Sequence, residues 1–324
     1  MPAFETLLSP VVLFFILGVL AAAARSDLAL PEPLAKSLSL YLMAAIGLKG
    51  GVQVASAGFT PELGQVALAG MGLSLALPVL AFTLLRGVAG LDRLNAAAVS
   101  AHYGSVSIVT FVTASDAFTR GGIPPAGYMV AVMALMETPA IVTGLVLARG
   151  GRAASGGAQT GNQRGKLLRE VLLNGSVVLL LGSFAIGLVL GKARFEPIAP
   201  VFATGFSGLL CLFLLDMGLI AMRRLQGSRA LTWRMAGLGL VLPVVNGAIG
   251  LAVAALLGLD AGTGAALAVL AASASYIAVP AAVRIALPDA DPGIYLSMSL
   301  AVTFPFNVLV GIPLLIQLAP RVLG

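Results

Sequence analysis

Long apolar runs, most of them free of charge, constrain this sequence more than any other feature. Hydrophobic residues make up 59% of the chain and charged residues only 10%, whereas a soluble domain carries roughly 25% charged residues. The runs are rich in Leu, Val and Ala and show no alternation with a period of two residues, so they indicate helices rather than barrel strands. The sequence therefore predicts an all-α integral membrane protein.

The runs predict about ten transmembrane helices, five on each side of a change in composition. In the first half we expect spans at 10–24, 31–49, 63–85, 95–118 and 126–148, and in the second half at 171–190, 199–222, 235–257, 262–287 and 293–318. Residues 149–169 are rich in Gly, Ser, Gln and Arg, which is typical of a flexible connector. The chain is thus divided into residues 1–148, a basic connector at 149–169, and residues 170–324.

Charge and cysteine content exclude several classes of protein. Glu5 is the only charged residue before the first span, so the basic region of a cleaved signal peptide is missing and we expect a retained helix. The single cysteine, Cys211, lies in an apolar run and predicts neither a disulfide nor a thiolate metal site. The isoelectric point near 9.9 reflects basic loops. It does not indicate a nucleic-acid partner.

Two apolar spans are interrupted by small and hydroxylated residues. The first interruption is Ala101-His-Tyr-Gly-Ser-Val-Ser-Ile-Val-Thr110, and the second is Ala272-Ser-Ala-Ser-Tyr-Ile-Ala-Val-Pro280. Their paired serines are separated by the same 168 residues (273 − 105 and 275 − 107). Interrupted helices at matching positions of two halves predict a transporter's substrate site. The alternative interpretation is close helix packing, which small residues also permit.

Other matches favour a duplicated chain. Pro125-Ala-Gly-Tyr128 resembles Pro292-Gly-Ile-Tyr295, Pro139 is matched by Pro305, and Ile46-Gly-Leu48 resembles Met217-Gly-Leu219. Because each half has an odd number of spans, the two copies are expected to have opposite orientations, as two inverted five-helix repeats.

The basic residues are distributed unevenly between the two ends of these spans. The connections after odd-numbered spans hold most of the 19 basic residues, and the opposite side holds only Lys49, Arg120, Lys192, Arg194 and Arg321. By the positive-inside rule the first group is cytoplasmic, so both termini are expected outside.

Glu137 is the most informative polar residue inside a span. A carboxylate there costs roughly 2.5–3.5 kcal/mol on insertion scales, so it normally faces a cavity, an ion or a partner. Pro139 removes a backbone donor and frees a carbonyl that could ligate Na⁺, and Pro305 is expected to do the same in the second half. We assign Glu137, Thr138 and Thr303 to cation binding or coupling. The alternative is a protonated, structural Glu137.

The remaining polar residues inside spans receive simpler interpretations. Asp216 is a second deep acid. We interpret His102 as a hydrogen-bonded packing residue, although it could switch charge near neutral pH. Asn246 and Asn307 are predicted to form hydrogen bonds between helices.

Half-helices that begin inside the membrane present free N–H groups and a positive dipole end, which suit a small anion. Hydroxyl groups carry no fixed charge and let such an anion leave again. We assign substrate binding to residues of the two interruptions, namely Gly104, Ser105, Ser107, Thr110, Ser273, Ala274 and Ser275. The pattern favours cation-coupled uptake of a small oxyanion. Enzyme activity is not expected, since neither Gly-x-Ser-x-Gly nor His-Glu-x-x-His is present.

Five short motifs, in this order, resemble the sodium-dependent bicarbonate transporter (SbtA-like) permease family. They are Ile46-Gly-Leu-Lys-Gly-Gly51, Tyr103-Gly-Ser-Val-Ser107, Met136-Glu-Thr-Pro-Ala140, Ala271-Ala-Ser-Ala-Ser275 and Gly311-Ile-Pro313. The resemblance implies Na⁺-dependent bicarbonate uptake across a bacterial inner membrane, with substrate held where broken helices four and nine cross at mid-membrane. It also implies a homotrimer surrounded by lipid and a PII-like regulator at the connector.

The sequence departs from the family pattern around the interruptions. Ile108 and Val109 replace a Gly and a Ser, Ala274 and Tyr276 replace a Ser and an Asp, and Glu137 stands in place of an Asp. These departures leave two alternatives to Na⁺-coupled bicarbonate uptake. One is a proton-coupled carrier of another small anion, and the other is a non-transporting sensor or scaffold derived from a transporter.

The charge asymmetry gives a testable topology. Single cysteines at Gly122 and at Ser155 should be labelled from opposite sides of sealed vesicles by a membrane-impermeant maleimide, with Gly122 accessible from outside. Labelling of both positions from the same side would contradict the assigned orientation.

Overall fold

The computed structural model describes residues 8–58, 60–150, 175–228 and 230–324, and every regular element in this part of the chain is helical. Eight of the described helices are long and apolar enough to cross a membrane, and two more apolar helices, at Pro10–Ala23 and Ala261–Ala272, are shorter. The all-helical prediction is confirmed. Nearly all of the predicted connector at 149–169, and the start of the second half, lie outside the described residues.

The helices follow the predicted order of spans. Before the connector they are α2 (Pro10–Ala23), α3 (Glu32–Ala57), α4 (Pro61–Gly87), α5 (Arg93–Gly104), α6 (Ile108–Arg120) and α7 (Met129–Arg149). After it come α9 (Gly175–Phe195), α10 (Phe206–Gly227), α11 (Trp233–Leu256), α12 (Ala261–Ala272) and α13 (Ala278–Ala286). The short turns η1 (Glu196–Ile198) and η2 (Pro200–Thr204) join α9 to α10.

The last span is continuous but irregular. It consists of α14 (Pro292–Leu296), η3 (Ser297–Thr303), α15 (Phe304–Phe306), η4 (Asn307–Gly311) and α16 (Ile312–Leu323), in which η3 and η4 are π-helical. Pro305 lies between these two wide turns, because a proline has no N–H to continue the α-helical ladder. The helix is irregular around Pro305, whereas a carbonyl there that ligates Na⁺ stays a prediction.

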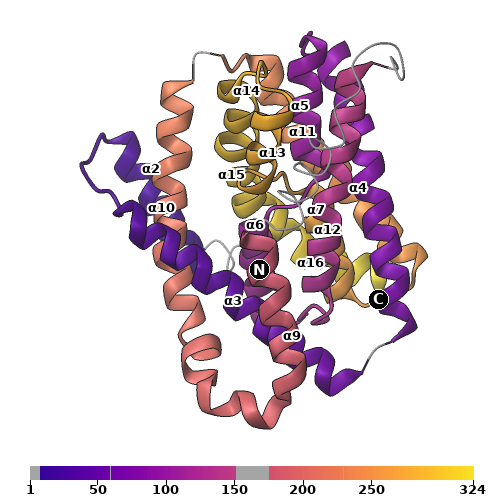
Figure 1. The fold of residues 1–324 in the computed structure, drawn as a ribbon. Helices are drawn as coiled ribbons and strands as arrows, with labels where there is room; N and C mark the ends of the chain where they lie inside the picture. The colour runs from indigo at the N-terminus through magenta and orange to yellow at the C-terminus, as the bar shows by residue number, and fades with distance from the viewer. Residues whose placement is uncertain (1–7, 59, 151–174, 229) are drawn as a thin grey trace.

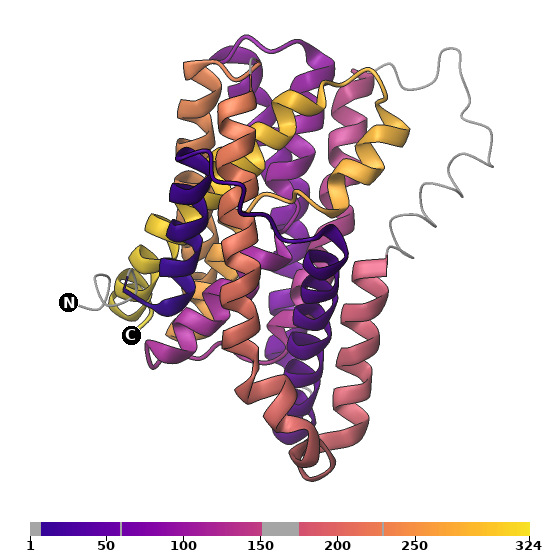
Figure 2. The same ribbon diagram turned by 90° about the vertical axis from the view of Figure 1, so that its left-hand side faces the viewer.

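The helices form two groups that lie side by side. Figure 1 shows α2, α3, α9 and α10 towards the left and α4, α5, α7 and α11 towards the right, and Figure 2 shows α3 running alongside α9. In the first group α3 packs on α9 and α2 packs on α10, whereas in the second α4 packs on α5 and α7, and α11 on α12. The helix α6 lies at the boundary between the groups and contacts α3, α12 and α16.

Two glycine-to-glycine crossings hold the first group together. At one, Gly51 of α3 lies against Gly187 of α9, and at the other Gly18 of α2 lies against Gly218 of α10. In both crossings a Cβ on either glycine would meet the carbonyl oxygen three residues before the partner glycine, so only glycine lets the backbones approach this closely.

The crossings also bear on a sequence match. Gly51 and Gly218 meet their partner helices in the same way. The match of Ile46-Gly-Leu48 with Met217-Gly-Leu219 pairs Gly47 with Gly218 instead, one helical turn away, and the repeat itself stays a prediction. A repeated small residue every four positions makes such slips hard to detect from sequence.

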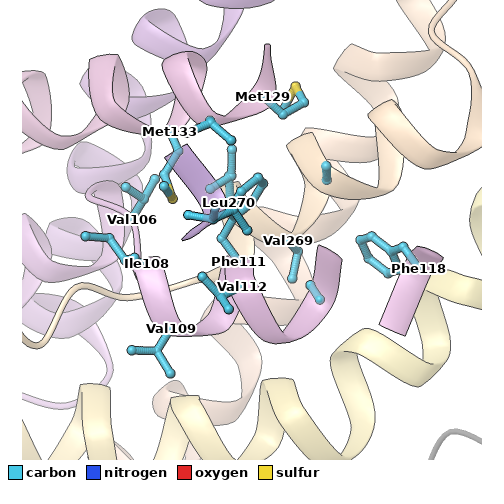
Figure 3. Packing of buried hydrophobic residues seen from close by; sticks show 14 of the residues in the cluster. Val106, Ile108, Val109, Phe111, Val112, Phe118, Met129, Met133, Val269 and Leu270 are labelled. Atoms are coloured by element: carbon cyan, nitrogen blue, oxygen red, sulfur yellow. The ribbon is translucent and has the colours of Figure 1, made fainter. Parts of the chain in front are cut away.

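The interior between the groups is filled by large apolar side chains. Figure 3 shows Phe111 of α6 among Met133 of α7 and Leu270 of α12, with Met129 and Val269 beside them. All five side chains are buried. This packing fixes α6 against the second group and thereby places the end of the first interruption.

The prediction that Lys49 lies at the end of a span is wrong. The helix α3 continues to Ala57, so Lys49 is two turns inside it and half-buried, with its Nζ 4.6 Å from the ring centroid of Phe206. A lysine with a long apolar stem and an aromatic neighbour is tolerated within a helix that the hydropathy pattern alone would end.

The crossings predict a contrast between two glycines of α9. Gly187→Ala should lower the free energy of unfolding by roughly 1–3 kcal/mol, because the new methyl group would overlap the α3 backbone. Gly182→Ala, on an open face of the same helix, should be neutral or stabilising by up to about 1 kcal/mol. Thermal unfolding of the two purified variants, followed by size-exclusion fluorescence, checks this. Equal melting temperatures would contradict the crossing.

Candidate functional site

The two interruptions occupy the same place in two matching helices. Both α5 and α12 are 12 residues long, and both begin behind an aspartate cap, Asp92 or Asp260, whose side chain accepts from two backbone N–H groups. Each ends at a serine in extended conformation, Ser105 (φ −87°, ψ 169°) or Ser273 (φ −79°, ψ 161°). The 168-residue separation of the predicted serines therefore corresponds to one local structure built twice.

The caps lie at the ends of the helices, away from the interruptions. The Asp92 carboxylate accepts hydrogen bonds from the N–H groups of Leu94 and Asn95 at 2.9 and 3.0 Å. Burial by itself raises the pKa of Asp92, but these hydrogen bonds, together with one from the Asn95 side chain, outweigh it and lower the pKa. An ionised cap stabilises the helix N-terminus at neutral pH.

The two interruptions are hydrogen-bonded to each other. The Ser107 N–H donates to Ser273 Oγ at 2.9 Å, and the Ser275 N–H donates to the His102 carbonyl at 2.9 Å. His102 Nδ1 contacts the Ser275 carbonyl, so Nδ1 carries the proton. Backbone groups that leave the helical ladder are thus paired across the crossing, as an apolar environment demands.

Most of the predicted hydroxyls are used inside the protein. Ser107 Oγ accepts from the N–H of Thr110 at 3.1 Å and from its hydroxyl at 2.9 Å, which caps α6. Ser105 donates to the Glu137 carbonyl at 3.4 Å, and Ser273 donates to the Leu270 carbonyl at 2.8 Å. Ser275 Oγ differs, because its one hydrogen bond within the described residues, 3.4 Å from the Val279 N–H, uses the oxygen only as an acceptor.

A small cavity brings three of the predicted residues together. Ser107, Ser275 and Glu137 line a space of about 10 Å³ beside Tyr276, roughly the volume that one water requires. Of the other predicted residues, Gly104, Thr110, Ser273 and Ala274 are buried nearby without lining it. In this conformation the site is closed to an ion the size of bicarbonate.

Gly104 and Thr303 have clear structural roles. A Cβ on Gly104 would overlap Pro78 of α4 and approach Ala140 of α7, so glycine permits this close packing. Thr303 donates to the Gly239 carbonyl at 2.7 Å and lies 2.6 Å from the Tyr103 hydroxyl. Neither Thr303 nor Thr138 lines the cavity that Glu137 faces.

Glu137 is buried within α7, and no basic side chain of the described residues lies within ion-pair distance of it. Two carbonyls next to the one that Pro139 frees, those of Met136 and Glu137, are already engaged. Ser74 of α4 donates to the Met136 carbonyl and accepts from the Ala140 N–H at 3.2 Å, while Ser105 donates to the Glu137 carbonyl. The Ser74 hydroxyl thus bridges the Met136 carbonyl and the Ala140 N–H, which would otherwise bond each other within α7 beside Pro139. Its role was missed because a lone serine in an apolar span carries no sequence signal.

Other predicted polar contacts are confirmed. Asn246 donates to the Tyr103 carbonyl at 3.3 Å, and Asn307 donates to the Ala272 carbonyl, at the end of α12, at 2.9 Å. His102 is a buried packing residue that stacks on Tyr295, although its Nε2 has no partner among the described residues. Asp216 is buried in α10 and does not line the cavity at Ser107 and Ser275.

Ile108 and Val109, which depart from the family pattern, lie against the group that contains α3 and α10. Together with Leu42 and Met43 of α3 and Phe213 of α10, they surround an apolar space of about 10 Å³. We call Ile108 and Val109, with these neighbours, the apolar seal. The Gly and the Ser of the family pattern are therefore replaced by larger apolar residues where the helix groups touch.

The comparison with protein families now decides the class. The model of the Na⁺-dependent bicarbonate transporter superfamily matches residues 10–320. The chain belongs to this superfamily. A search of the curated proteins gave no match. Membership confirms the predicted family, which is a family of transporters, and the apolar helices agree with a multi-pass membrane protein.

The hydrogen bonds at the crossing separate two serines experimentally. Ser273→Ala leaves the buried Ser107 N–H without its partner and should lower the free energy of unfolding by about 1–3 kcal/mol. Ser275→Ala removes only a long bond and should cost less than about 0.5 kcal/mol. Melting temperatures in one detergent measure both. A Ser275→Ala variant that is less stable than Ser273→Ala would contradict these roles of the two serines.

Proposed function

We propose that the protein is a secondary active transporter that couples Na⁺ influx to uptake of a small monovalent oxyanion, bicarbonate. The observation that carries this proposal is the crossing itself, where Ser107 pairs with Ser273 and Ser275 with His102. Interrupted helices that meet within a bundle are the usual substrate site of such transporters. The family match across residues 10–320 supports the substrate and the ion.

An inverted repeat is part of the proposal, with a five-helix unit in residues 1–148 and another in 170–324. It is supported by the equal lengths of α5 and α12, by their aspartate caps, and by the two similar glycine crossings. Both termini are placed outside on the charge asymmetry. A bacterial inner membrane, a homotrimer and a PII-like regulator at 149–169 rest on the family resemblance.

The anion is assigned to the cavity at Ser107, Ser275 and Tyr276. The donors left over within the described residues are the Ser275 hydroxyl and the buried Tyr276 hydroxyl, which lies near Ser107 but meets no partner at hydrogen-bonding geometry. Because the cavity holds about one water, binding requires the two helix groups to move apart. The further cavities along α6 lie at the same boundary, which is where alternating access would open.

Glu137 is assigned to coupling. Glu137 lines the anion cavity, and a Na⁺ there would be attracted by the carboxylate and by the anion, of whose two negative charges it would offset one. Because Tyr276 stands where the family pattern has an Asp, Glu137 is the only acid that lines this cavity. A single acid favours one coupled ion per cycle.

Proton coupling through Glu137 is the second candidate. It is favoured because the second carboxylate expected of a sodium site is missing.

The proposal is tested in proteoliposomes by uphill accumulation of radiolabelled bicarbonate under an inward Na⁺ gradient, with counterflow of other small anions measured in parallel. We expect accumulation that collapses when the gradient is removed. Ser275→Ala, which should fold normally, is expected to weaken apparent affinity by a few-fold to about tenfold. No accumulation under any ion gradient would support the sensor or scaffold alternative instead.

A substitution at Glu137 distinguishes the coupling ions. If the carboxylate attracts Na⁺, Glu137→Gln keeps the shape but removes most of the attraction, and uptake should lose its dependence on Na⁺ concentration. Initial rates are measured against Na⁺ at fixed pH and then against pH at fixed Na⁺. Loss of the pH dependence alone would establish proton coupling. Unchanged dependence on both would make Glu137 structural.

A further inference from the structure

A second cavity lies between the helix groups, nearer the end of the molecule where α3 ends and α7 begins. It has a volume of about 90 Å³ and is lined from α3 by Lys49 and Gln53, and from α6 by Ser115 and Asp116. Ile46 and Phe111 form its apolar end. Phe111 is one helical turn from Ile108, so this cavity adjoins the apolar seal on the approach to the crossing.

Lys49 gives the cavity a positive charge. The side chain is half-buried, and no carboxylate of the described residues lies within ion-pair distance of its Nζ. The ring of Phe206, 4.6 Å away, supports the cation from one side but cannot neutralise it. A partly desolvated ammonium with an open face towards a cavity favours an anion there.

Asp116 is the obvious competitor, but its carboxylate is committed elsewhere. One oxygen forms an ion pair with Arg120, and the other accepts from the Ser207 hydroxyl at 2.9 Å. Asp116 still lines the cavity and its charge acts on Lys49. With Arg120 paired to Asp116, the three side chains together carry one net positive charge.

Neutral donors complete the arrangement. Ser115 Oγ is buried and has no hydrogen-bond partner among the described residues, which is costly unless a ligand or a water satisfies it. Gln53 adds a side-chain amide on the opposite wall. Thr119 is not counted, because its hydroxyl already donates to the Ser115 carbonyl.

We propose that this cavity is a second anion site, in which Lys49, Gln53 and Ser115 bind a small oxyanion before it reaches the crossing. The volume suits an ion of a few heavy atoms, unlike the closed space at Ser275. Under the predicted topology it opens to the outer side. Its role in staging the substrate rests on the proposed function, whereas its affinity for an anion does not.

Equilibrium dialysis of radiolabelled bicarbonate against the full-length protein in detergent, with Na⁺ present, tests the proposal. The wild-type chain should bind two anions. Lys49→Gln should weaken one of these sites about tenfold or more, because a charged hydrogen bond is lost. Lys49→Arg, which keeps the charge, should retain it, and Asp116→Asn should tighten it by removing a nearby negative charge.

The two sites are separated by Ser275→Ala, which should weaken the crossing site and leave the Lys49-dependent one intact. Binding to the crossing site in Lys49→Gln serves as the control for folding. An isotherm of Lys49→Gln identical to wild type, or weaker binding in Asp116→Asn, would overturn the second site. Persistent Lys49-dependent binding in a protein that fails to accumulate bicarbonate would confirm the site and refute only the transport role.

Discussion

The pairing of backbone groups at the crossing governs the rest of this structure. A helix that stops in an apolar environment leaves N–H and carbonyl groups that cost several kcal/mol each if they remain unpaired. Here α5 and α12 stop beside one another and partner each other, through Ser107 with Ser273 and Ser275 with His102. Each interruption thus satisfies backbone groups of the other, so the two halves of the chain support one another where they meet.

Much of the fold was predictable because its determinants are local. Apolar length located the spans, and the shared spacing of Ser105 and Ser273 located the interruptions, because a broken helix needs small and hydroxylated residues at the break. Ser74, Thr303 and Lys49 were missed or misplaced for a different reason. What each does depends on a neighbour distant in the chain: Ser74 on the α7 ladder, Thr303 on Tyr103, and Lys49 on Phe206. No pattern along the sequence records those partners.

The family departures acquire a physical meaning from their positions. Ile108 and Val109 lie against α3 and α10, where they add apolar contact between the helix groups. Ile108 also lines the cavity at Ser107 and Ser275, beside Tyr276, whose neutral hydroxyl stands where the family pattern has an acid. The departures from the family pattern therefore make both the contact between the groups and the wall of this cavity less polar.

The apolar seal also has an electrical consequence. A cavity that admits water stays close to the potential of the solution it opens to, so the transmembrane voltage falls mainly across the dry part of the structure. The cavity at Lys49 reaches to within one turn of Ile108. Most of the voltage is therefore concentrated over a short distance at the seal, where moving one net charge is worth about 2.3 kcal/mol per 100 mV.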